Sequence, residues 1–232
     1  MENEEQTQEP KKETEEGECE ILREDFPKFD LSFKIIVIGD AGVGKSCLSL
    51  QATKRRFESN YLATIGVESF TFVMRYKDKI IRMQILDTCG QEIYKSLISN
   101  FYRNSSLAVL VYSIDSKESF NHVENWLNDL RSQANEDVRV ILIGNKADLE
   151  SERKVSKEEG EKYKLDNNLD FFMETSAKTG QNARNVLVEA SKILYNDYLK
   201  LEKNMNKVEE PKKKIGGTAN LVQPKKKEKG CC

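Results

Sequence analysis

The sequence predicts an α/β fold with three layers, in which a six-stranded, mostly parallel sheet has helices on both faces and one antiparallel edge strand. Apolar runs of strand length recur six times, and helix-length segments separate most of them, which is typical of a parallel sheet covered by helices. Only residues 77–79 join the second run to the third. Three residues are too few for a helical crossover, so this pair is predicted to be an antiparallel hairpin.

Each element follows from its own pattern. The predicted strands are residues 33–39, 67–76, 80–86, 107–114, 138–144 and 169–173. Two helices are predicted where apolar residues recur three or four positions apart. These residues are Phe120, Val123, Leu127 and Leu130, with Trp126 alongside, and then, after Gly180, Val186, Leu187, Ala190, Ile193 and Leu194. We interpret both stripes as surfaces that face the core.

Charge divides the chain into three parts. The protein has 232 residues and a formal net charge of −2, so its overall field gives no indication of nucleic-acid binding. Residues 1–30 are acidic and poor in apolar groups, which predicts a disordered N-terminal extension. Residues 31–201 form the predicted domain, and residues 202–232 are predicted to be a flexible basic tail.

Several function classes receive no support. No apolar run reaches the roughly 18–20 residues of a membrane-spanning helix, and the acidic start lacks the features of a secretion signal. The five cysteines have neither disulfide-framework nor metal-ligand spacing. The single histidine, His122, lies among helix-type residues, and we expect it to be solvated or hydrogen-bonded rather than a catalytic base. We therefore expect the protein to work in the cytosol.

Residues 39–46 (GDAGVGKS) match the phosphate-binding pattern G-x-x-x-x-G-K-[ST] between a predicted strand and a helix. The glycines allow the backbone N–H groups to point at an anion, and the N-terminus of the following helix adds a positive potential. Lys45 supplies a charge for the β- and γ-phosphates, and Ser46 offers a hydroxyl group to Mg²⁺. The domain is therefore predicted to be a P-loop NTPase.

Residues 145–148 (NKAD) indicate which base is bound. They follow the buried run 138–144, and so lie at the carboxyl end of a strand, where α/β sheets bind ligands. The Asp148 carboxylate can accept hydrogen bonds from N1–H and the amino group of guanine, whereas adenine would leave it unpaired. The sequence therefore favours guanine over adenine.

From about residue 33 to residue 201 the chain resembles a small GTPase of the Ras superfamily, and it is most similar to the Rab branch. Five motifs carry the resemblance in family order: residues 39–46, 64–66 (TIG), 87–92 (DTCGQE), 145–148 and 175–178 (TSAK). The insertion that Rho proteins carry before the last motif is absent, and residue 2 is Glu, where Arf proteins have an acylated glycine. Residues 64–68 and 110–112 resemble Rab more than Ras.

The resemblance implies roles for the residues around the phosphates. Thr64 becomes a ligand of Mg²⁺ and the γ-phosphate, and Asp87 holds Mg²⁺ through water, so that Ser46, Thr64 and Asp87 form the metal set. Gly90 gives its N–H to the γ-phosphate. Gln91 becomes the catalytic residue that orients the attacking water.

It also implies roles around the base. Phe57 packs on the guanine face, Lys146 and Lys178 stack their stems against the base, and Ala177 donates its N–H to O6. The full nucleotide-binding set implied is Ala41, Gly42, Val43, Gly44, Lys45, Ser46, Cys47, Phe57, Thr64, Gly90, Asn145, Lys146, Asp148, Ser176, Ala177 and Lys178.

By the same resemblance the protein is a GTP/GDP-regulated switch that hydrolyses GTP slowly and recruits effectors in vesicle trafficking. Its expected partners are an exchange factor, a GTPase-activating protein, a GDP-dissociation inhibitor or escort protein, and effectors, with a monomeric domain and no nucleic acid. The terminal Cys231 and Cys232 resemble the Rab signal for double geranylgeranylation, and two lipid chains suffice for stable anchoring. Nearby lysines add attraction to anionic membranes. We expect the protein on the cytoplasmic face of an intracellular membrane, cycling with the cytosol.

Five positions depart from the Rab pattern. Ala41 stands where Ras has glycine and many Rabs serine, and we expect its methyl group to slow hydrolysis. Cys89 replaces the usual alanine and adds a thiol. Ser69, Leu86 and Phe101 stand where Phe, Trp and Tyr form the effector-reading triad of Rabs. Effector identity therefore does not carry over from the family.

Two alternatives remain open at this point. An ATP-dependent nucleoside or shikimate-type kinase could share the phosphate loop, although it would not need residues 145–148. A nucleotide-locked binding module, which holds GTP and hardly cleaves it, is the second, and the departures at Ala41, Cys89 and the changed triad motivate it.

Overall fold

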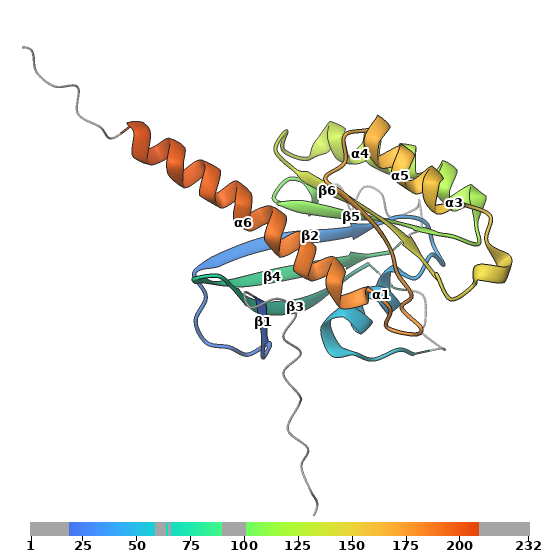
Figure 1. The fold of residues 1–232 in the computed structure, drawn as a ribbon, viewed down its shortest axis with the longest axis horizontal. Coiled ribbons are helices and arrows are strands. Elements are labelled where there is room, and N and C mark those ends of the chain that lie inside the picture. The colour runs from blue at the N-terminus through green and yellow to red at the C-terminus, as the bar shows by residue number, and fades with distance from the viewer. Residues whose placement is uncertain (1–18, 59–63, 65, 90–100, 209–232) are drawn as a thin grey trace, which may run out of the picture.

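The computed structural model describes residues 19–58, 64, 66–89 and 101–208, which fold into a seven-stranded sheet with helices on both faces (Figure 1). The strands are β1 (Cys19–Leu22), β2 (Leu31–Ile38), β3 (Val67–Tyr76), β4 (Lys79–Thr88), β5 (Leu107–Ser113), β6 (Arg139–Asn145) and β7 (Phe171–Glu174). The helices are α1 (Lys45–Lys54), α3 (Lys117–Asn121), α4 (Val123–Gln133), α5 (Lys157–Asp166) and α6 (Ala183–Val208), with a 3₁₀ turn, η2 (Glu150–Glu152). The predicted α/β class with a mostly parallel sheet is confirmed.

The strand order is β1-β3-β4-β2-β5-β6-β7. β2 pairs in parallel with β4 and β5, and β5, β6 and β7 continue in parallel. The predicted hairpin is present, because β3 runs antiparallel to β4 over its whole length, from the pair Val67 and Thr88 to the pair Tyr76 and Lys79. Among the strands in the described part, β3 alone runs against the others.

The N-terminal segment corrects two predictions. β1 pairs antiparallel with β3, so the sheet has seven strands rather than six and β3 is not its outermost strand. The predicted disorder of residues 1–30 is wrong for residues 19–30, since Asp30 also exchanges hydrogen bonds with Ile80. Local composition missed this because the unpaired edge of β3, which supplies the partner groups, lies some fifty residues away in the sequence. Residues 1–18 lie outside the described residues.

The C-terminal helix corrects a third prediction. α6 ends at Val208, so residues 202–208 are helical rather than part of a flexible tail. These residues are mostly good helix formers and extend a helix that packing has already nucleated. Residues 209–232 lie outside the described residues. No helix in the described part of the chain has the length and apolar character needed to cross a membrane.

Two cores lie on opposite faces of the sheet. One packs α1 and α6 against the sheet, and the other packs α3, α4 and α5 against its opposite face. The predicted stripe around Trp126 is buried but spans two helices, because α3 and α4 meet at His122. The second stripe lies on α6, where Val186, Ala190 and Leu194 are buried. With a helix on either face, the loops that follow the parallel strands remain at the carboxyl edge of the sheet.

Candidate functional site

The predicted site residues meet at the carboxyl edge of the sheet. Residues 39–44 connect β2 to α1, residues 145–148 end β6, and residues 175–178 follow β7. Asp87 lies near the end of β4, and Thr64 precedes β3. Segments that are far apart in the sequence are thus brought to one place by the parallel order of the strands.

Two glycines of the phosphate loop are required by close packing. Gly39 has φ of 141°, and a Cβ there would lie 2.1 Å from the carbonyl oxygen of Val111 in β5. Gly44 has φ of 92°, and a Cβ there would lie 2.5 Å from the side-chain nitrogen of Asn145. A larger residue at either position would strain the backbone and collide with a neighbour. The loop therefore touches both the central sheet and the segment that is expected to read the base.

Lys45 is buried at the start of α1, and its ammonium group donates to the backbone oxygen of Asp40 at 2.7 Å. Burial lowers the pKa of Lys45 to about 8, although the charges of Asp87 and Asp40 oppose the shift. Within the described residues, this buried cation has one carbonyl group as its hydrogen-bond acceptor, which compensates its charge poorly. An anion in the loop would supply the missing negative charge.

Three oxygen-bearing side chains converge beside it. The Ser46 hydroxyl donates to Asp87 Oδ2 and lies 2.6 Å from Thr64 Oγ1. Burial raises the pKa of Asp87 to about 6, and the hydrogen bond from Ser46 and the charge of Lys45 only partly oppose this shift. Asp87 Oδ1 is buried and has no hydrogen-bond partner among the residues that the structure describes. Hydroxyl and carboxylate oxygens around an unpartnered buried oxygen fit a hard divalent cation such as Mg²⁺.

Asn145 ties the base-side loops to the phosphate loop. Its amide nitrogen donates to the Val43 carbonyl oxygen at 2.8 Å. Its amide oxygen accepts from the Thr175 hydroxyl at 3.1 Å and from the Ala177 N–H at 3.2 Å. The Ala177 N–H, which the family resemblance assigns to guanine O6, is thus directed at Asn145. One buried side chain therefore joins three loops.

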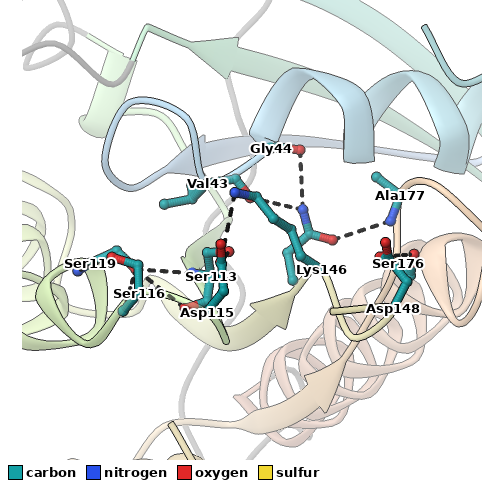
Figure 2. A network of polar contacts seen from close by, with 11 residues as sticks. Val43, Gly44, Ser113, Asp115, Ser116, Ser119, Lys146, Asp148, Ser176 and Ala177 are labelled. Atoms are coloured by element: carbon teal, nitrogen blue, oxygen red, sulfur yellow. Dashed lines mark hydrogen bonds and ion pairs between the residues drawn. The ribbon is translucent and has the colours of Figure 1, made fainter. Parts of the chain in front are cut away.

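Asp148 lies beside Ser176, as Figure 2 shows. The Ser176 hydroxyl donates to Asp148 Oδ1 at 2.5 Å, and Lys178 Nζ lies 3.9 Å from Oδ2. The carboxylate is therefore oriented from one side by a hydroxyl group. Its expected partners on guanine are donors, which suit a carboxylate held in a fixed direction.

The structure adds a residue that sequence reasoning missed. Lys146 Nζ lies 3.7 Å from Asp115 Oδ1, and the Ser113 hydroxyl donates to the same carboxylate (Figure 2). Burial raises the pKa of Asp115, but hydrogen bonding from Ser113 and the charge of Lys146 together outweigh burial, so that the pKa is lowered overall. Asp115 comes just after the end of β5, at the carboxyl edge of the sheet. That position is the feature of the sequence that could have indicated its role.

Other predicted residues lie at the margin of the site. Ala41 and Gly42 are exposed, Phe57 is 40% exposed, and Cys47 is half-buried with a pKa that burial raises. Gly90, Gln91, Cys231 and Cys232 lie outside the described residues.

Two of the departures from the Rab pattern face each other. Ser69 and Leu86 are cross-strand partners in β3 and β4, with Ser69 exposed and Leu86 buried. Phe101 is half-buried beneath Lys34, whose ammonium group lies 5.3 Å from the ring centroid. A partner at this surface would therefore meet Ser69 more readily than Leu86.

A comparison with known families was made over the whole sequence. A family model described as the Ras family matches residues 34–196, which include every described site residue. The match begins within β2 and ends within α6.

Proposed function

The chain belongs to the Ras family, and from this premise we propose that it is a Rab-like GTPase that recruits effectors to an intracellular membrane in vesicle trafficking. Ras-family proteins are GTP-hydrolysing switches that bind GTP, GDP and Mg²⁺. The kinase alternative is thereby set aside. The Rab assignment is supported by residues 64–68, residues 110–112 and the two terminal cysteines.

The observation that carries the switch is the position of Asn145. Its hydrogen bonds join the phosphate loop at Val43 to the base-side loop at Ala177. A nucleotide that spans both loops is thus held at both ends by segments with a fixed spacing. Such pre-organisation favours tight and selective binding.

Each part of the chain has a role in this mechanism. Lys45 exchanges the Asp40 carbonyl for the β- and γ-phosphates, while Asp148 selects guanine. Ser46, Thr64 and Asp87 would hold Mg²⁺, which when bound neutralises phosphate charge. Gln91 orients the attacking water. The sequence contains no motif that would supply an arginine in cis, so we expect slow hydrolysis that an activating protein accelerates strongly.

The order of two loops depends on whether GTP or GDP is bound. Contacts from Thr64 and Gly90 to the γ-phosphate hold two loops in place, and hydrolysis releases them. Double lipidation at Cys231 and Cys232, together with the lysines of residues 212–214 and 225–229, keeps the domain at a membrane.

Single-turnover hydrolysis tests the enzymatic part. We expect slow cleavage of GTP that is faster with an added activating protein, and a further drop of roughly tenfold or more in Gln91→Leu. Ser46→Asn should weaken Mg²⁺–GTP binding relative to GDP. No cleavage under either condition would instead support the nucleotide-locked module that Ala41 and Cys89 motivate.

Localisation tests the trafficking part. The tagged protein should associate with an intracellular membrane, and a form lacking the last two residues should be found in the cytosol. Mass spectrometry of the membrane-bound protein should find both terminal thiols modified. Unmodified thiols in native membranes would overturn the anchoring proposal and leave the GTPase assignment intact.

A further inference from the structure

Asp40 of the phosphate loop is held by two side chains from the junction of α3 and α4. The indole N–H of Trp126 donates to Asp40 Oδ1 at 2.7 Å, and His122 Nδ1 lies 2.7 Å from Asp40 Oδ2. An ionised carboxylate only accepts hydrogen bonds, so the proton of this contact belongs to the imidazole. Both oxygens of one carboxylate are thus engaged by ring nitrogens.

The two donors lie one helical turn apart at the start of α4. The Trp126 N–H of the backbone donates to the His122 carbonyl oxygen, which places the two side chains one turn apart. Trp126 is 3% exposed and packs in the core beneath α3 and α4. Its indole is therefore a fixed donor, whereas His122, with a side chain 41% exposed, closes the arrangement from the solvent side.

Asp40 is well placed to control the loop. Its neighbour Gly39 is confined by the backbone of β5, while Ala41 is exposed and a Cβ at Gly42 would meet no atom of the described residues within 4 Å. The Asp40 carbonyl oxygen is also the acceptor of the Lys45 ammonium group. Asp40 thus lies between the confined end of β2 and the exposed tip of the loop, and its carbonyl oxygen holds Lys45. The bonds to its side chain therefore fix the position of this residue.

We propose that Asp40, His122 and Trp126 form an anchor, here called the Asp40 anchor, that positions the phosphate loop and Lys45 for the β-phosphate of a bound nucleotide. When a phosphate draws Lys45 away from the Asp40 carbonyl, the anchor keeps the loop from following it. These are positioning residues, because they act through the loop and through Lys45. The inference rests on the proposed nucleotide binding.

The test compares GDP with GMP, because GMP lacks the β-phosphate. The variants are Asp40→Ala, Trp126→Phe, which keeps an aromatic side chain and removes the indole N–H, and His122→Gln, with Asp166→Ala as a control at an exposed carboxylate of α5. We expect Asp40→Ala to bind GDP about tenfold more weakly and to release it correspondingly faster, and Trp126→Phe to lose about threefold. GMP affinity should change less than twofold in every variant, as should GDP affinity in the control.

The single tryptophan provides a second readout. Release of GDP by chelation of Mg²⁺ should change the Trp126 emission of the wild-type protein, because its indole is bonded to the loop. The Asp40→Ala protein should lack this response. A merely structural role would instead lower GDP and GMP affinity together and leave the fluorescence response in place.

The outcomes separate the two proposals. Wild-type protein that retains neither GDP nor GTP would overturn the proposed function and the anchor with it. Wild-type retention of GDP, with unchanged release from Trp126→Phe and His122→Gln, would overturn the anchor alone. These two milder variants decide the matter should Asp40→Ala fail to fold.

Discussion

The two ends of the nucleotide site are built differently. On the phosphate side, comprising Lys45, Ser46, Thr64 and Asp87, the functional groups mostly bond to one another, and one buried carboxylate oxygen has no hydrogen-bond partner in the described part of the chain. On the base side, comprising Asn145, Asp148, Ser176 and Ala177, each group is held by a side chain or backbone group of another loop.

This difference distinguishes residues that stabilise the fold from residues whose charges need a bound ligand. The shifted pKa values of Lys45 and Asp87, to about 8 and about 6, show that both charges are costly where they are buried. The base side has its buried amide satisfied before any ligand binds. We therefore expect loss of the buried Asn145 amide to weaken the fold itself, and substitutions on the phosphate side to weaken mainly the response to ligand.

The largest effect is expected at Asn145, on the base side. Asn145→Ala removes one donor and one acceptor and leaves the Val43 carbonyl and the Ala177 N–H without their partner. The free energy of unfolding should fall by about 4 kcal/mol, with or without GDP. Urea unfolding measures it, and Asn135→Ala, at an exposed position after α4, should change it by less than ~0.5 kcal/mol.

The next effect isolates base selection from stability. Asp148→Asn should lose about 100-fold in GDP affinity, or roughly 2.7 kcal/mol, because the charge-assisted acceptor of two guanine donors is removed. Competition between GTP and ATP measures the loss of preference. A variant that kept its preference for guanine would break the assignment of Asp148 and of the whole base side.

A third prediction concerns the cost of charge on the phosphate side. Because burial raises the pKa of Asp87 from 3.8 to about 6, the folded protein keeps a proton that the unfolded chain releases between these values. Without nucleotide and Mg²⁺, stability should therefore fall as the pH rises from about 4 to about 6. Asp87→Asn should remove this fall and stabilise the ligand-free protein by about 2 kcal/mol at neutral pH.

The same variant should lose the stabilisation that GDP and Mg²⁺ give the wild-type protein. Thermal unfolding with and without both ligands measures this difference. A lower stability of ligand-free Asp87→Asn than of wild type would contradict the contrast between the two sides.

The smallest effect lies at Asp115, where the pair with Lys146 is partly exposed. Asp115→Asn should weaken GDP binding about twofold to threefold and change stability by less than ~0.5 kcal/mol, because a solvated ion pair contributes little. GDP titration measures the first quantity. A change of tenfold or more would mean that Asp115 fixes Lys146 much as Asn145 fixes the loops.

Much of this architecture can be predicted from contiguous residues. The runs predicted at 33–39 and 138–144 are β2 and β6, within two residues at each end, because continuous apolar stretches reflect burial on both faces. The phosphate loop and the NKAD segment were placed at strand ends from their neighbours alone. Such features are local, since they depend on the backbone freedom and the side-chain types of adjacent residues.

Other features depend on which segments the fold brings together. Neither the pairing of β1 with β3 nor the bond from Trp126 to Asp40, which spans 86 residues, has a local pattern. The bond from Asn145 to Val43 spans 102 residues. By itself the sequence indicated six of the seven strands in their order along the chain, the loop proposed to take phosphate and the aspartate proposed to select the base. Tertiary structure alone decided how these parts are joined, because a hydrogen bond between distant residues forms only where the topology of the sheet sets their distance.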